Sequence, residues 1–149
     1  MATGHWLTNR GKLLLLQGAG SGWKLGLLVG TQPAGALTQA LVADLNTVND
    51  LLVTVGATEC SVGGYARQVL ATYTRTEDDT NDRVNLDYAD MAFGALGSGQ
   101  TAIGAFYYDA STDTNDTTRQ LASIDWFTTG VPTNGGTFTY AIADAYRLS

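Results

Sequence analysis

The segment TAIGAFYYDA, residues 101–110, contains aromatic and β-branched residues between turn-forming residues, and it predicts a β-strand. The second half of the chain has further segments of this kind, at residues 65–75, 83–93, 119–129 and 136–148. Short strands separated by turns, without intervening helices, are typical of antiparallel sheets. The sequence therefore predicts a mainly β protein whose body, residues 65–149, is an antiparallel β-sandwich or a jelly-roll-like fold.

Two of these segments alternate apolar and polar residues, as strands with one apolar face do. In RVNLDYADMAF, residues 83–93, the apolar positions are Val84, Leu86 and Tyr88. In GTFTYAIADAYRL, residues 136–148, they are Phe138, Tyr140 and Ile142.

The first 64 residues predict a portion with short helices and one strand, packed on or extending from this body within a single structural domain. LTNRGKLLLLQGAG, residues 7–20, predicts a helix with Thr8 or Asn9 as its N-cap, although Gly11 weakens the pattern. WKLGLLVG, residues 23–30, predicts a short strand. An apolar stripe at helical spacing predicts a second helix, and its residues are Leu37, Leu41, Leu45, Val48, Leu52 and Val55. Alternatively, Asp44 is the N-cap of a shorter helix that starts at Leu45.

The charge balance is acidic, with 14 Asp and Glu residues against 8 Lys and Arg residues. Nucleic acids and anionic membranes are bound by clustered cations, so neither is an expected partner. The single cysteine, Cys60, rules out a disulfide within the chain. No segment has the pattern of a secretory signal peptide, and the aliphatic run at residues 13–16 is far too short to cross a bilayer. The sequence therefore predicts a soluble protein without an export signal.

The tetrapeptide Asp-Thr-Asn-Asp occurs twice, at residues 79–82 and 113–116, each time between two expected strands. Asp and Asn side chains bond to nearby backbone and tolerate left-handed geometry, so both copies are interpreted as turns. A calcium loop of the EF-hand type needs alternating oxygen ligands, a glycine and a late acidic residue, and neither copy has this pattern. A looser cation site in the acidic loops 77–82 and 109–116 stays open, but no metal site is predicted.

The sequence contains no recognisable catalytic constellation. The only histidine, His5, lies in an N-terminal segment expected to be mobile, so it offers no rigid Ser–His or Cys–His pair. QGAGSG, residues 17–22, lacks the Lys-Ser/Thr of a phosphate-binding loop. Acidic residues such as Asp87, Asp90, Asp109 and Asp125 are too numerous to single out a pair for glycoside hydrolysis. The sequence therefore predicts a protein that is not an enzyme, with no catalytic residues and no cofactor.

Six segments, in this order, resemble small structural proteins of tailed bacteriophages, most of all head decoration (capsid cement) proteins. They are TNRGKLLLL (8–16), LLVGTQPAG (27–35), DLNTVNDLL (44–52), GGYARQVL (63–70), TAIGAFYYDA (101–110) and FTYAIADAYRLS (138–149). The most suggestive part is the succession of Asp-Leu-Asn-x-Val at 44–48 and Gly-Tyr-Ala-Arg-Gln at 64–68.

The resemblance implies a β-sandwich or jelly-roll-like body on the outside of an icosahedral head, commonly as a homotrimer at local threefold positions. The implied partner is the major capsid protein, and the implied location is the virion exterior after synthesis in the host cytoplasm. The resemblance carries over no catalytic residue. A tail or neck component is an alternative, and a carbohydrate-binding virion module with exposed aromatic side chains is another.

The first 43 residues contain three cations and no acidic residue, whereas all 14 acidic residues follow. An apolar segment without acids is easily buried against a partner, so this N-terminal portion is the expected contact with the capsid. The expected contact residues are Trp6, Leu13, Leu14, Leu15, Leu16 and Trp23. The alternative is that these side chains fill the core of the protein itself.

Overall fold

The computed structural model describes residues 2–17, 22–31, 38–81, 83–111, 114–142 and 146–148. It is mainly β, with antiparallel sheets and few helices, as the sequence predicts. The strands are β1 (Ala2–Leu7), β2 (Trp23–Val29), β3 (Thr58–Glu59), β4 (Gln68–Val69), β5 (Tyr73–Asp78), β6 (Arg83–Tyr88), β7 (Met91–Ala95), β8 (Thr101–Asp109), β9 (Gln120–Pro132), β10 (Thr137–Tyr140) and β11 (Tyr146–Leu148). The helical elements are α1 (Asn9–Leu16), α2 (Gln39–Asp44) and the π-helical turn η1 (Asp50–Thr54).

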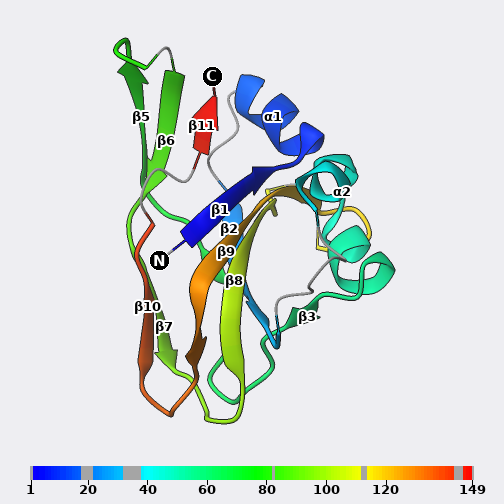
Figure 1. Cartoon of the computed structure of the whole chain (residues 1–149), viewed down its shortest axis with the longest axis vertical. Coiled ribbons are helices and arrows are strands. Elements are labelled where there is room, and N and C mark those ends of the chain that lie inside the picture. Colours follow the sequence, from blue (N-terminus) through cyan, green and yellow to red (C-terminus); the bar gives the residue numbers. More distant parts are fainter. Residues whose placement is uncertain are drawn as a thin grey trace.

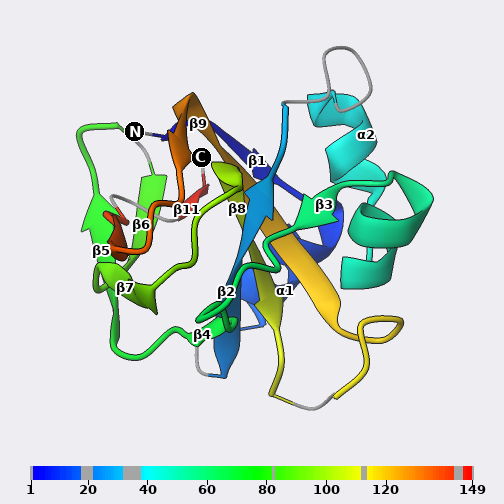
Figure 2. The ribbon, with the colours of Figure 1, turned by 90° about the horizontal axis from the view of Figure 1, so that it is seen from below.

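The strands form three antiparallel sheets (Figure 1). The large sheet has the order β1-β9-β8-β2-β3, and β4 also pairs with β2. The two smaller sheets have the orders β10-β7 and β11-β6-β5. Figures 1 and 2 show the small sheets on one side of the large sheet, with α2 and the helical turns that follow it on the other. The described chain is therefore an open sandwich with a helical layer on its outer face.

Apolar clusters cover both faces of the large sheet. The cluster between the large and small sheets includes Trp23, Leu25, Leu27, Tyr107, Phe93 and Phe138. The cluster under the helical layer includes Phe106, Tyr108, Ile124, Val42, Leu45 and Val48. As a result, residues 102–108 of β8 are all buried. Strands that are buried on both faces are mostly apolar along their whole length, which is the pattern of residues 101–110.

The first 64 residues do not form a portion separate from the body. β1 pairs with β9, and β2 lies between β3 and β8. The expectation of one strand in this portion is therefore wrong, since β1, β2 and β3 all lie within it, and the N-terminal segment expected to be mobile forms β1. β1 is an edge strand, whose backbone forms hydrogen bonds to β9 on one side.

The apolar stripe predicted as one helix from residue 37 to 55 is broken in its middle, and Leu37 lies outside the described residues. α2 ends at Asp44, and Leu45 has an extended backbone with φ −71° and ψ 134°. The next residue pairs with the large sheet, since Leu121 N–H donates to the carbonyl oxygen of Asn46 at 3.0 Å. Backbone pairing with β9 replaces helical hydrogen bonds at this point.

A reciprocal cap starts the helical turn after this break. The Asp50 carboxylate accepts hydrogen bonds from the backbone N–H groups of Asn46 and Thr47 at 3.1 and 2.9 Å. The Thr47 hydroxyl in turn accepts from Asp50 N–H at 3.1 Å. This arrangement is a capping box, with Asp50 in the position that Glu or Gln usually occupies.

The single strand predicted for residues 65–75 is also interrupted. β4 belongs to the large sheet and β5 to a small one, so the chain crosses between layers here. Thr72, between the two strands, has φ +46°, a conformation that β-branched residues rarely adopt. The segment 83–93 likewise divides into β6 and β7, which belong to different sheets.

Helix α1 packs closely on β9. The Thr8 hydroxyl caps the helix, accepting from Gly11 N–H at 2.7 Å and donating to the Leu121 carbonyl oxygen at 2.7 Å. Gly11 is buried, and a Cβ at this position would lie 2.1 Å from the carbonyl oxygen of Ala122. The glycine that weakens the helix pattern in the sequence therefore allows the helix backbone to approach the strand.

We expect Gly11→Ala to lower the free energy of unfolding by about 1–3 kcal/mol, because the added methyl group overlaps a backbone carbonyl. In an open helical position the same substitution would be stabilising by up to about 1 kcal/mol. Urea unfolding measures the change. Gly94→Ala is the control, since nothing lies within 4 Å of a Cβ at that site. Equal losses from both variants would contradict the explanation.

Candidate functional site

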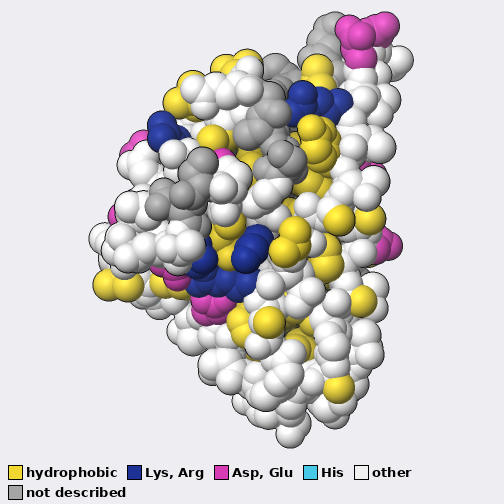
Figure 3. Space-filling view, turned by 180° about the vertical axis from the view of Figure 1, so that it is seen from behind, with side chains coloured by type: hydrophobic (Ala, Val, Ile, Leu, Met, Phe, Trp, Pro, Cys, Tyr) yellow, Lys and Arg dark blue, Asp and Glu magenta, His cyan; other side chains and the backbone are white. Residues whose placement is uncertain are grey.

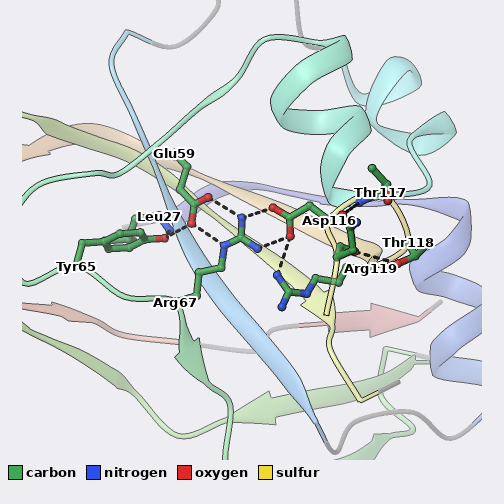
Figure 4. A network of polar contacts seen from close by, with 9 residues as sticks. Leu27, Glu59, Tyr65, Arg67, Asp116, Thr117, Thr118 and Arg119 are labelled. Carbon is green, nitrogen blue, oxygen red and sulfur yellow. Dashed lines mark hydrogen bonds and ion pairs between the residues drawn. The ribbon is translucent and has the colours of Figure 1, made fainter. Parts of the chain in front are cut away.

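Arg67 lies at the centre of a polar network on the outer face of the large sheet (Figure 4). Its Nε and Nη2 atoms donate to the two carboxylate oxygens of Glu59 at 2.7 and 2.6 Å. Its Nη1 and Nη2 atoms donate to the two carboxylate oxygens of Asp116, both at 2.7 Å. Arg119 adds a bond from Nη1 to Asp116 at 2.8 Å. Arg67 thus forms bidentate ion pairs with two carboxylates at once.

Aromatic rings lie beneath this guanidinium. The Arg67 Cζ atom lies 5.3 Å from the ring centroid of Phe106 and 5.1 Å from that of Tyr108, within the range of cation–π attraction. Gly26 leaves room for the Phe106 ring, since a Cβ at Gly26 would lie 2.3 Å from the ring Cζ atom. The position of the charged network therefore depends on a glycine in β2.

Tyr65 joins the network to β2. Its hydroxyl donates to Glu59 at 2.7 Å and accepts from Leu27 N–H at 3.0 Å. Burial and the charge of Glu59 raise the pKa of Tyr65, so its hydroxyl stays protonated. Burial alone would lower the pKa of Arg67, but its hydrogen bonds to Glu59 and Asp116 raise it. The hydrogen bond from Arg67 holds the pKa of Asp116 below its ordinary value, so both groups of this pair stay ionised at neutral pH.

The network joins segments that lie far apart in the chain. Glu59 belongs to β3, Arg67 precedes β4, and Asp116 and Arg119 precede β9. Only 16% of the Arg67 side chain is exposed. The Glu59 and Asp116 carboxylates accept hydrogen bonds from two edges of its guanidinium group. Two arginines also balance two carboxylates in charge. The arrangement is suited to holding loops together, and we call it the Arg67 clamp.

The two Asp-Thr-Asn-Asp copies are turns, as the sequence predicts. In the first, the Asn81 side-chain amide donates to the Asp78 carboxylate at 2.9 Å, and Asn81 N–H donates to the Asp78 carbonyl oxygen at 3.2 Å. In the second, the Asn115 side chain accepts from Thr117 N–H at 3.1 Å. Asp82 and Asp113 lie outside the described residues. The second copy also supplies Asp116 to the clamp, which turn chemistry alone does not predict.

The looser cation site in the loops 77–82 and 109–116 finds no support in the described residues. No group of three or more His, Cys, Asp or Glu side chains gathers there, or elsewhere in the described ranges, as a metal ion requires. The side chain of His5 lies outside the described residues.

Asp125 is a buried acid, only 4% exposed, between the large sheet and the small ones. The hydroxyls of Tyr107 and Tyr140 donate to one of its carboxylate oxygens at 3.1 and 2.5 Å. Burial and the Asp125 charge raise the pKa of Tyr140. Asp90 accepts from the backbone N–H of Ile142 at 3.0 Å. Each of these two carboxylates therefore has a hydrogen-bond partner within the fold.

Several side chains expected to contact a partner belong to the core instead. Trp23 has no exposed surface and Leu14 is 5% exposed, so both are unavailable to a partner. Their role as contacts is contradicted because β2 and α1 direct them between the sheets, where they pack in one apolar cluster. Leu15 packs against the same cluster, and Trp6 packs against the cluster on the other face.

The remaining two expected contact residues, Leu13 and Leu16, are exposed. Leu13 is 41% exposed and Leu16 is 77% exposed. They are three residues apart on α1 and therefore share one side of the helix. Lys12, also exposed, is adjacent in sequence. We call these three residues the α1 surface.

Most described aromatic side chains are buried, and Tyr73 is the only aromatic residue among the exposed large hydrophobic residues of the described chain. A pocket of about 330 Å³ lies near the end of β2, and its lining contains no charged side chain. Trp126 lines it, and no hydrogen-bond partner accepts from its indole N–H. The described residues therefore do not form an exposed aromatic platform for sugar stacking.

The sequence does not identify Glu59 and Arg67 as partners of Asp116. Arg67 and Asp116 are 49 positions apart, and spacing arguments do not reach that far. The only signal is the motif at residues 64–68, which contains Tyr65 and Arg67 and which the sequence singles out through its resemblance alone.

We expect Arg67→Ala to lower the free energy of unfolding by about 3 kcal/mol, because it leaves two partly buried carboxylates without their cation. Arg67→Lys should recover only part of the loss, since an ammonium cannot form two bidentate pairs. Guanidinium unfolding measures both variants, with exposed Lys12→Ala as the control. A loss below roughly 0.5 kcal/mol for Arg67→Ala, the range of ordinary surface substitutions, would show that the clamp does not stabilise the fold.

In the described part of the chain, no helix combines the length and the apolar character needed to span a membrane. No family model, curated protein or solved structure matches this chain. Its function is therefore inferred from its own residues.

Proposed function

We propose that this chain is a non-enzymatic structural protein of a tailed-phage virion, which binds the outer surface of the capsid and stabilises it. The resemblance of its sequence to head decoration proteins supports the phage context. The observation that carries the docking role is the α1 surface, where Leu13 and Leu16 are 41% and 77% exposed. Large apolar side chains that a helix presents to water are candidates for burial in a partner.

The α1 surface is held in place before any partner binds. The Thr8 cap and the close approach at Gly11 fix α1 against β9. A preorganised contact loses little conformational freedom on binding, which favours affinity. Lys12 lies beside the two leucines, and no acidic residue precedes Asp44 in the chain. The matching face of the capsid protein is therefore expected to be apolar with acidic residues at its rim.

The polar groups of the core favour a structural role over an enzymatic one. Asp125 bonds to two tyrosines, and the clamp engages Glu59 and Asp116. A catalytic acid or base needs to reach a substrate, and these groups are occupied by the chain. The carbohydrate-binding alternative has less support, because such a site uses exposed aromatic rings and the described rings are mostly buried.

Stabilisation of a shell by such a protein is a mass-action effect, since ligands that bind the assembled state alone favour it. It requires many copies per particle. We expect quantitative mass spectrometry of purified particles to find this chain at a copy number near that of the major capsid protein. A few copies per particle would point to the tail or neck instead. Absence from the particle would overturn the proposal.

We expect Leu16→Asp to weaken binding to capsid shells by about tenfold or more, because it places a charge in the centre of an apolar contact. Co-sedimentation with shells that lack this protein measures the affinity. Val53→Asp is the matched control, since Val53 is 71% exposed on η1, outside the α1 surface. Unchanged circular dichroism would exclude unfolding as the cause.

Deleting the first two dozen residues would be a poorer test, because it removes β1 and α1 and cuts into β2. Full affinity of Leu16→Asp together with Leu13→Asp would exclude the α1 surface as the contact.

A further inference from the structure

The β5–β6 hairpin projects from the body of the molecule (Figures 1 and 3). β5 is the end strand of its sheet, whose order is β11-β6-β5. Residues 73–77 of β5 are all exposed, so the strand presents both faces and its outer edge to water. A strand with an open edge can accept a further strand through its backbone N–H and C=O groups.

The charges on β5 are arranged so that the strand is complementary to itself. Arg75 and Glu77 flank Thr76 and lie on the same face, because side chains alternate along a strand. If two copies pair antiparallel with Thr76 on the twofold axis, Arg75 of each lies opposite Glu77 of the other. The same register places Thr74 opposite Asp78, a hydroxyl donor opposite a carboxylate. Opposite charges facing each other across two strands are favourable.

Charged residues on an edge strand commonly prevent association, because most registers place like charges together or leave a charge unpaired. β5 differs in that a single twofold register pairs Arg75 with Glu77 on both sides of the axis and places no like charges opposite each other, while the Asp78 carboxylate also accepts from the Asn81 amide of its own chain. Tyr73 is 36% exposed and Val84, on the neighbouring strand β6, is 44% exposed. These apolar side chains add surface that a second copy would remove from water.

We propose that β5 is an interface with a second copy of this chain, in which two β5 strands pair antiparallel about Thr76. The contact is isologous, since the same residues serve on both sides. It joins the β11-β6-β5 sheets of the two copies into one continuous sheet of six strands, three from each copy. It does not depend on the proposed function. It also differs from the threefold assembly that the phage resemblance implies, because a twofold contact joins copies in pairs.

Cysteine cross-linking tests the register directly. In the proposed pair, Thr76→Cys places two thiols opposite each other, at the distance between paired strands that a disulfide can bridge. In Thr74→Cys the two thiols are roughly 13 Å apart, too far to bridge. We therefore expect at least about tenfold more disulfide-linked dimer from Thr76→Cys than from Thr74→Cys under mild oxidation. The native Cys60 is 3% exposed and does not compete.

Charge reversal provides a second, independent readout by analytical ultracentrifugation. Arg75→Glu and Glu77→Arg each place like charges opposite each other, and each should weaken self-association. The double variant restores opposite charges and should associate as the native chain does. Equimolar mixing of the two single variants should also restore association, because each supplies the charge that the other lacks.

Equal cross-linking of the two cysteine variants would overturn the proposal, since it would show that the pair has no fixed register about Thr76. Failure of the double variant to recover association would overturn it as well. An interface built from one strand of each copy is small, so the native dimer is expected to be weak and to depend on protein concentration.

Discussion

Strand β8 lies inside the large sheet with apolar side chains on both of its faces, and residues 102–108 are all buried. Removing both faces from water is favourable only if each face has a cover. The small sheets provide one cover, and α2 with the turns after it provides the other. The two layers outside the large sheet therefore have the same physical role, although one is β and the other helical.

Polar contacts determine where the outer layer lies. The Arg67 clamp joins Glu59 to Asp116 over the rings of Phe106 and Tyr108, and the Asp50 cap starts the turn that follows α2. A buried ion pair often contributes less stability than apolar residues of the same shape, so its main effect here is to fix the loops in one arrangement. The motifs at 44–48 and 64–68, on which the phage resemblance chiefly depends, supply Asn46 and Thr47 to the cap and Arg67 to the clamp. In this chain those motifs serve the fold.

The local spacing of apolar residues predicted those parts of the fold in which no distant segment competes with the local preference. Phe138, Tyr140 and Ile142 are buried, as the alternation predicts, and the strand over 23–30 is confirmed as β2. The single strand predicted over 136–148 is wrong, because this segment divides into β10 and β11, which belong to different sheets. The prediction failed where a tertiary partner competes with local preference. The stripe from residue 37 to 55 has helical spacing, but pairing with β9 breaks it after Asp44. The predicted contact residues also divide into buried and exposed ones. Residue type does not separate them, because an apolar side chain on the outside of a helix and one in the core look the same in the sequence.

The sequence by itself determined the mainly β class, the strands with regular alternation and the turn chemistry of both Asp-Thr-Asn-Asp copies, because these depend on neighbours along the chain. Only the tertiary structure decided that β1 joins the large sheet, that Trp23 is core while Leu16 faces water, and that Arg67 pairs with Asp116. These features depend on contacts between residues far apart in sequence. Such contacts are chosen by the packing of whole layers, which the order of residue types does not reveal.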